Sequence, residues 1–205
     1  MFIVFEGVDG AGKSTQLKFF VEWLQANHYD VVTCKDPGST ELGEQLRAIL
    51  LGRHDVPIHM RTEMMMFTTA RTQLVQQIVK PAIESGKTVV LDRYIFSTVV
   101  YQGHAGGLDP DELWKVNQIA TEGLLPDLTF VLDLPVDVEV TRLGKSLDRM
   151  ESRGVEYMQR VRDGFLKEAE RWPDKVEIVN ADRSADEIQK EIRAIAQRYF
   201  DRKTA

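Results

Sequence analysis

The sequence lacks the features that secreted, zinc-binding and membrane-spanning proteins need. Its single cysteine, Cys34, cannot form an internal disulfide, and no set of Cys and His residues has the spacing of a zinc site. The apolar run before Glu6 covers only residues 2–5, too short for the core of a signal peptide or for a spanning helix. We therefore expect a cytoplasmic protein from a reducing compartment, without a membrane partner.

The sequence also lacks an excess of positive charge. It has 26 basic and 32 acidic residues and a formal net charge of −6. Binding to nucleic acid regardless of sequence needs a basic surface that displaces counterions, so we expect no nucleic-acid partner. Any anionic ligand must then be held by positive charge gathered locally.

The remaining composition is that of an ordinary globular protein, with 43% hydrophobic and 28% charged residues. The length of 205 residues predicts one domain, residues 1–205, and we find no internal repeat or linker.

Short apolar runs alternate with longer segments of helical spacing along the chain. The expected strands are Phe2–Phe5, Val31–Thr33, Thr88–Leu91, Thr129–Leu132 and Val176–Val179. The expected helices lie at about 14–26, 40–51, 60–85, 109–124, 136–144, 155–172 and 184–200. This order predicts a three-layer α/β fold: a five-stranded parallel sheet flanked by helices, with ligands at the carboxyl ends of the strands.

One segment, at about 142–154, differs from the rest in composition because it is basic and has few large apolar residues. We interpret it as a short basic lid with glycine hinges. Its basic residues and glycines are Arg142, Gly144, Lys145, Arg149, Arg153 and Gly154.

The first expected strand runs directly into a phosphate-binding motif, G-x-x-x-x-G-K-[ST], and a helix follows. Such a loop turns backbone N–H groups around phosphate oxygens, Lys13 neutralises phosphate charge, and Ser14 can bind Mg²⁺. A glycine-rich turn without a ligand is the alternative, and the complete motif between strand and helix disfavours it. The predicted ATP-binding residues are Gly7, Val8, Asp9, Gly10, Ala11, Gly12, Lys13, Ser14 and Thr15.

A phosphate-binding loop does not by itself separate a kinase from a GTPase or a motor ATPase. A GTPase would carry Asn-Lys-x-Asp near the fifth strand, where this chain has Asn180-Ala181-Asp182. The third strand ends in Asp92 and Arg93. Asp92 can hold the magnesium shell together with Ser14, or it is simply a solvated strand end, whereas Arg93 can grip a second phosphate through its two-pronged guanidinium.

The helix at about 60–85 carries an arginine in an apolar stripe. Phe67, Arg71, Leu74 and Ile78 follow helical spacing and lie along one side. Arg71 can reach solvent past the apolar residues or pair with a carboxylate. Alternatively, Phe67 stacks on a nucleobase and Arg71 donates to a base carbonyl. The stripe alone leaves these alternatives open.

The order of these motifs resembles bacterial thymidylate kinases over essentially the whole chain. The segments that carry the resemblance are 5–15, 36–38, 42–47, 67–71, 92–94, 97–103, 126–129 and 147–151. The chain departs from many members of that family at Lys35-Asp36, where they have Arg-Glu, and at Ser39, where they have glycine.

The resemblance implies a P-loop kinase fold and a site for the acceptor dTMP. In it Phe67 stacks on thymine, Arg71 binds its O4 side, Arg47 and Arg93 hold the acceptor phosphate, and Tyr101 lies against C2′ of the sugar. Thr98 matches the position that contacts the base edge, and Gln102 lies at the sugar end. The implied dTMP-binding residues are Asp9, Pro37, Arg47, Phe67, Arg71, Arg93, Ser97, Thr98, Tyr101 and Gln102.

The same resemblance implies how catalysis is divided among the residues. Lys13, Arg93, Arg149 and Asp9 are the expected catalytic residues, with Arg149 supplying positive charge from the lid. Arg142 and Arg153 are further lid candidates. Ser14 and Asp92 are the expected metal-site residues, for the Mg²⁺ that accompanies ATP.

The expected activity is therefore transfer of the γ-phosphoryl group of Mg·ATP to dTMP, in a homodimer as is common in the family. A deoxynucleoside kinase or another nucleoside monophosphate kinase is the enzymatic alternative. A nucleotide-binding regulator that transfers no phosphate is the alternative from another class.

Overall fold

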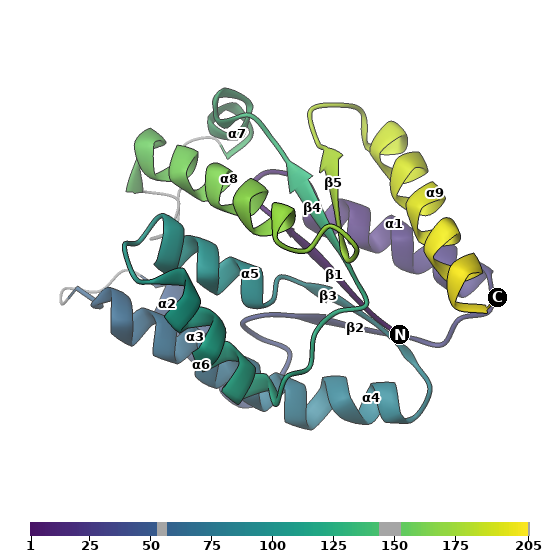
Figure 1. The fold of residues 1–205 in the computed structure, drawn as a ribbon, viewed down its shortest axis with the longest axis horizontal. Helices are drawn as coiled ribbons and strands as arrows, with labels where there is room; N and C mark the ends of the chain where they lie inside the picture. The colour runs from purple at the N-terminus through teal and green to yellow at the C-terminus, as the bar shows by residue number, and fades with distance from the viewer. Residues whose placement is uncertain (53–56, 144–152, 205) are drawn as a thin grey trace.

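A parallel sheet of five strands forms the centre of the chain (Figure 1). The computed structural model describes residues 1–52, 57–143 and 153–204. The strands are β1 (Phe2–Gly7), β2 (Val31–Lys35), β3 (Thr88–Asp92), β4 (Leu128–Asp133) and β5 (Val176–Asn180), in the spatial order β2-β3-β1-β4-β5. All five expected strands are confirmed, each one or two residues longer than the apolar run that indicated it.

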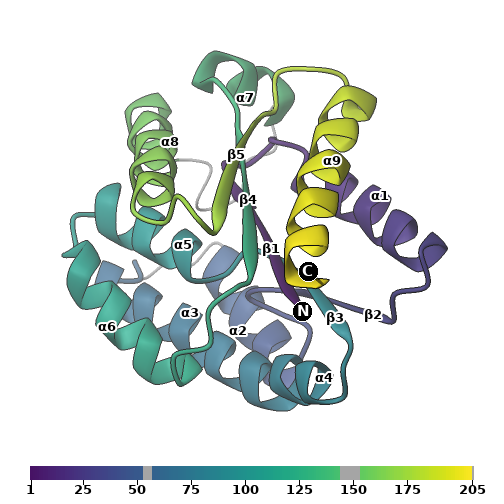
Figure 2. The ribbon, with the colours of Figure 1, turned by 45° about the vertical axis from the view of Figure 1, so that its right-hand side comes forward.

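Helices cover both faces of the sheet and complete three layers. They are α1 (Lys13–Ala26), α2 (Glu41–Leu51), α3 (Met60–Leu74), α4 (Lys80–Glu84), α5 (Ile95–Thr98), α6 (Pro110–Thr121), α7 (Val136–Leu143), α8 (Val155–Glu170) and α9 (Ala185–Thr204). Figure 2 shows α1 and α9 on one face, α5 and α8 on the other, and α2, α3 and α6 further out on that second side. No helix in the described ranges is both long and apolar enough to cross a membrane.

The core lies between these layers, and β1 is its centre. Every residue of β1 is buried, because the strand pairs with β3 on one side and β4 on the other and has helices above and below. This position explains why its sequence is a continuous apolar run rather than an alternating one.

One helical stretch was not expected from the sequence. Helix α5 continues into a π-helical segment, η2 (Val99–His104), and this stretch carries several of the predicted site residues. Because every residue from Ile95 to Gly103 except Ser97 is buried, the run has no amphipathic period, and the β-branched residues within it favour a strand when judged alone. A second π-helical segment, η1 (Val75–Val79), joins α3 to α4. The expected helix at 60–85 is therefore continuous, but it changes from α-helix to π-helix and back.

Candidate active site

The phosphate cradle follows β1 at the carboxyl edge of the sheet. Gly7 has a φ of 131°, and a Cβ atom there would lie 2.5 Å from the Leu132 carbonyl oxygen of β4. Gly12, with a φ of 85°, stands at the N-cap of α1 and brings no side chain to cap it. The first N–H groups of α1 therefore remain available to an anion at the positive end of the helix.

Lys13 lies beneath the cradle rather than in solvent. Its Nζ donates to the carbonyl oxygens of Gly7 at 3.0 Å and Val8 at 2.7 Å. Burial, reinforced by the positive charge of Arg93, lowers the pKa of Lys13 to about 8. At neutral pH the ammonium group is still mostly charged, as the neutralisation of phosphate requires.

The two predicted metal-site residues contact each other. The Ser14 Oγ donates to Asp92 Oδ2 at 3.1 Å, and Asp92 Oδ1 is buried with no hydrogen-bond partner in the described part of the chain. A hydroxyl and a carboxylate with a spare oxygen suit Mg²⁺, which prefers oxygen ligands. No group of three or more His, Cys, Asp or Glu residues suited to a metal occurs among the described residues. The pair therefore fits a metal ion only if its other ligands would come from elsewhere, such as nucleotide phosphates and water.

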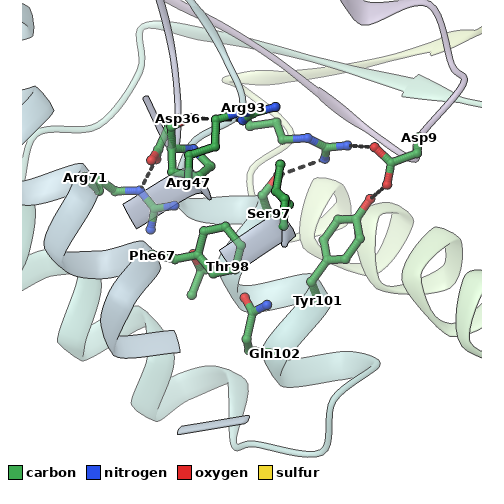
Figure 3. A pocket seen from close by; sticks show the side chains of 12 residues that line it. Asp9, Asp36, Arg47, Phe67, Arg71, Arg93, Ser97, Thr98, Tyr101 and Gln102 are labelled. Carbon is green, nitrogen blue, oxygen red and sulfur yellow. Dashed lines mark hydrogen bonds and ion pairs between the residues drawn. The ribbon is translucent and has the colours of Figure 1, made fainter. Parts of the chain in front are cut away.

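Arg93 extends from the end of β3 toward the cradle, with its backbone in the left-handed region at a φ of 66°. Its guanidinium forms a short hydrogen bond to Asp9 and donates to the Gly7 carbonyl oxygen at 3.0 Å and to Ser97 Oγ at 3.1 Å (Figure 3). Burial alone would raise the pKa of Asp9. The charges of Arg93 and Lys13 outweigh burial and hold this pKa below its usual range. Asp9 is thus an ionised carboxylate between two cations.

Next to Arg93 lies a pocket that opens to solvent, with about 540 Å³ of empty space when the adjoining open solvent is included. It contains all ten residues that the resemblance implies for dTMP, and in addition Asp36 and Leu51, which sequence reasoning did not include. The residues that line it are Asp9, Asp36, Pro37, Arg47, Leu51, Phe67, Arg71, Arg93, Ser97, Thr98, Tyr101 and Gln102.

The walls of the pocket combine an aromatic ring with hydrogen-bonding groups. Phe67 is only partly buried and lies with Thr98 and Gln102 on one wall (Figure 3). The Thr98 Oγ1 is buried and has no hydrogen-bond partner within the described residues. On the rim, Arg47 Nη1 donates to the Pro37 carbonyl oxygen at 3.0 Å. A planar polar molecule would find both a ring to stack on and unused polar atoms.

Arg71 is a buried residue of this wall, with an exposed side-chain fraction of 1%. Its Nε donates to Asp36 Oδ2 at 2.5 Å, its Nη2 to the Tyr94 carbonyl oxygen at 2.9 Å, and its Nη1 forms a short hydrogen bond to Asn117. Pairing with a carboxylate, one of the alternatives left open by the sequence, is therefore confirmed. Contact with a base stays a prediction, which the position of Arg71 in the pocket wall allows.

Comparison with known proteins gives one consistent result. The family model described as "Thymidylate kinase" matches residues 5–192. The chain is 41% identical to a thymidylate kinase from Symbiobacterium thermophilum, with 99% of this chain and 95% of the relative covered. It is 40% identical to one from an Exiguobacterium, with 94% and 92% covered. The chain belongs to the thymidylate kinase family.

A solved structure of the same family agrees in fold. The crystal structure of thymidylate kinase from Ehrlichia chaffeensis superposes with a TM-score of 0.78 at 30% identity, covering 96% of this chain and 98% of the other. Membership of the thymidylate kinase family and the expected fold are thus both confirmed.

The departures from common thymidylate kinase sequences have visible consequences. Ser39 adopts a φ of 63°, a backbone conformation that glycine tolerates more readily, and its Oγ accepts from the Lys35 N–H at 2.9 Å. Lys35 forms an exposed ion pair with Glu44 at 3.0 Å. Asp36, by contrast, is turned inward to Arg71.

Two carboxylates that sequence reasoning missed support the site of this thymidylate kinase family member. Glu6 is buried and accepts from the Tyr94 N–H at 2.7 Å and from Ser97 Oγ at 2.6 Å, and burial raises its pKa. Glu63 of α3 is buried and accepts from Gln102 Nε2 at 2.8 Å. Glu6 follows a continuous apolar run and Glu63 lies one turn before Phe67 on an apolar stripe, so the only signal for either was a charged residue beside expected core positions.

The expected lid at 142–154 is described only at its two ends, and Arg149, Lys145 and the rest of 144–152 lie outside the described residues. Arg142 donates to the carbonyl oxygens of Gly10 in the cradle, at 3.3 Å, and Ala181, at 3.2 Å. Arg153 pairs with Glu63 at 2.7 Å. Of the three lid arginines, Arg142 is therefore placed at the cradle and Arg153 beside the pocket.

Proposed function

We propose that this chain transfers the γ-phosphoryl group of Mg·ATP to dTMP, which gives dTDP and ADP. The thymidylate kinase family supplies the acceptor and the reaction class. The position of Arg93 supports the assignment of the donor to the cradle and of the acceptor to the pocket. Arg93 donates to the Gly7 carbonyl oxygen of the cradle and also lines the pocket. One guanidinium can therefore contact phosphates on both sides.

The donor side consists of the cradle and Lys13. The unpaired N–H groups at the start of α1 bind phosphate oxygens, and the Lys13 ammonium exchanges its two carbonyl contacts for the β- and γ-phosphates. Ser14 and Asp92 would hold Mg²⁺, which offsets the negative charge of these phosphates when it is bound.

The acceptor side is the pocket. We assign Phe67 to stacking on the thymine ring and the unused N–H groups of Arg71 to its O4 atom. Arg47 and Arg93 hold the 5′-phosphate as two-pronged donors. Tyr101, whose hydroxyl donates to Asp9 Oδ2 at 2.9 Å, closes the sugar end and disfavours a ribose 2′-hydroxyl.

The chemical step needs positioning and positive charge more than proton transfer. The attacking atom is a phosphate oxygen that is already an anion, so no strong general base is required. Arg93 draws the acceptor phosphate toward the γ-phosphate, and Asp9 fixes the orientation of that guanidinium. We assign to Arg149 of the lid the charge that stabilises the transferring group.

A coupled assay of ADP release tests this function. The chain with Mg·ATP is given dTMP, dUMP, the ribonucleotide TMP, dGMP or thymidine in parallel. We expect dTMP to be the best acceptor and dUMP to react about 10- to 200-fold less efficiently, since one missing methyl group costs about 1–3 kcal/mol. Thymidine as the best acceptor would indicate a deoxynucleoside kinase, and no acceptor-dependent release would indicate a regulator.

We also propose that residues 1–205 act as one kinase domain within a homodimer. Large apolar side chains are exposed on α2, α3 and α6, which lie on one side of the molecule (Figure 2): Ile49 at 44%, Met65 at 55% and Ile119 at 80%. Light scattering should give a dimer for the natural chain and a monomer for Ile119→Glu, because a buried unpaired charge opposes association.

A further inference from the structure

The direction of the Arg71 guanidinium is set by acceptors from three separate elements. A guanidinium has five N–H donors and no acceptor. Asp36, after β2, takes the Nε donor; Asn117, on α6, takes one from Nη1; and the Tyr94 carbonyl takes one from Nη2. Within the described part of the chain this leaves one N–H on each terminal nitrogen for a molecule in the pocket.

Asn117 is fully buried and does not itself line the pocket. Its Nδ2 donates to the Leu113 carbonyl oxygen at 2.8 Å, one turn earlier on α6, which fixes the amide with Oδ1 toward Arg71. Asp36 already balances the charge of Arg71. The neutral Asn117 amide therefore contributes direction rather than charge.

The guanidinium of Arg71 can adopt a second orientation if Asn117 is replaced. Asp36 Oδ1 is buried and has no hydrogen-bond partner within the described residues. A guanidinium released by Asn117 can turn to use both carboxylate oxygens, the arrangement that arginine and carboxylate favour. Turning would withdraw a donor from the pocket.

We propose that Asn117 is a positioning residue that keeps two Arg71 donors facing the base and thereby makes the pocket select a 4-carbonyl over a 4-amino group. The inference rests on the proposed function, because it takes a thymine ring as the ligand. A 4-amino group would place N–H against N–H, and both groups would lose hydrogen bonds in a desolvated pocket.

The discriminating pair of acceptors is dTMP and 5-methyl-dCMP, which share methyl group, sugar and phosphate and differ at position 4. Asn117→Leu removes the acceptor at nearly constant volume. Asn117→Asp keeps an oxygen toward Arg71 but loses the Nδ2 donor, so it separates the two hydrogen bonds of Asn117. Trp114→Phe is the matched control, because it removes a buried hydrogen bond of the same helix, from Nε1 to Glu168 at 2.8 Å, away from the pocket.

For Asn117→Leu we expect the KM for dTMP to rise about tenfold or more with kcat nearly unchanged, the pattern of lost binding rather than lost chemistry. The ratio of kcat/KM for dTMP to that for 5-methyl-dCMP should fall at least about tenfold, as when one oriented hydrogen bond is lost. Asn117→Asp and Trp114→Phe should keep the natural ratio.

The inference would be overturned if folded Asn117→Leu kept the natural ratio of kcat/KM for the two nucleotides. It would also be overturned if Trp114→Phe lowered that ratio as much as Asn117→Leu does. If Asn117→Leu does not fold, Asn117→Ser, whose hydroxyl is one bond shorter, replaces it. Calorimetric binding of both nucleotides to the same variants decides the question without turnover. A natural chain that fails to phosphorylate dTMP would refute the proposed function, whereas the affinity ratio would still test Asn117.

Discussion

Arg93 and Asp9 form an ion pair that bridges the end of β3 and the phosphate cradle. Both side chains are partly buried, with exposed fractions of 17% for Arg93 and 28% for Asp9. Arg93 holds this place in a left-handed backbone conformation that a non-glycine residue adopts at a cost. This placement supports our proposal that Arg93 supplies positive charge where the two phosphates would meet.

Replacing Arg93 tests that role. For Arg93→Ala we expect kcat to fall by about 10² to 10³, the loss measured when one preorganised donor to a developing charge is removed. Arg171→Ala removes the arginine that follows α8 and pairs with Asp111 and Glu168, away from the pocket, and it should keep the natural rate. A natural kcat in Arg93→Ala, measured at saturating dTMP, would show that the cation between the sites is dispensable.

Phe67 is expected to act on the acceptor alone. Stacking of a base on an aromatic ring is worth about 1–3 kcal/mol, so Phe67→Ala should raise the KM for dTMP about 5- to 150-fold and leave the KM for ATP unchanged. Thr69→Ala, on the exposed side of α3, is the control. If Phe67→Ala lowers the melting temperature without changing either KM, the ring has only a packing role.

The buried pair of Arg71 and Asp36 should dominate the stability of the acceptor side. Asp36→Ala leaves the guanidinium without its charged partner at full burial, which costs about 3–5 kcal/mol in the free energy of unfolding. Urea titration measures it. Glu44→Ala breaks the exposed pair with Lys35 and should cost much less, because solvent screens that pair. Equal losses in the two variants would contradict the burial argument.

The lowered pKa of Lys13, about 8 instead of 10.5, predicts how ATP binding depends on pH. In the ligand-free chain the ammonium loses its proton above about pH 8, whereas bound phosphates favour the charged form. ATP affinity should therefore fall as pH rises from 8 to 10, by at most about tenfold per pH unit. In the unfolded chain Lys13 keeps its proton up to about pH 10.5. Lys13 therefore makes the free energy of unfolding of the ligand-free chain rise as the pH increases from 8 to 10.

Calorimetry in buffers of different ionisation enthalpy measures this effect directly. Binding of ATP near pH 8.5 should take up a proton, and Lys13→Arg should abolish the uptake because arginine stays charged. An affinity that is constant from pH 7 to 10 would contradict the assignment of the titration to Lys13.

The sheet and the cradle could be predicted from sequence because their signals are local. Continuous apolar runs mark buried strands, and the residues from Gly7 to Thr15 carry a motif whose spacing is dictated by phosphate geometry. The helix at Ile95–Thr98 could not, since a segment buried on all sides has no period. The partners of Arg71 could not be predicted from sequence either, because Asp36 and Asn117 lie 35 and 46 positions away along the chain.

The central claim is that the pocket beside Arg93 holds the phosphoryl acceptor, and a crystal structure with dTMP and a non-hydrolysable ATP analogue tests it most directly. We predict the thymine ring against Phe67, its O4 atom within hydrogen-bond distance of Arg71, and the 5′-phosphate on Arg93, facing the γ-phosphate in the cradle. Density for dTMP anywhere else, with this pocket empty, would contradict the account.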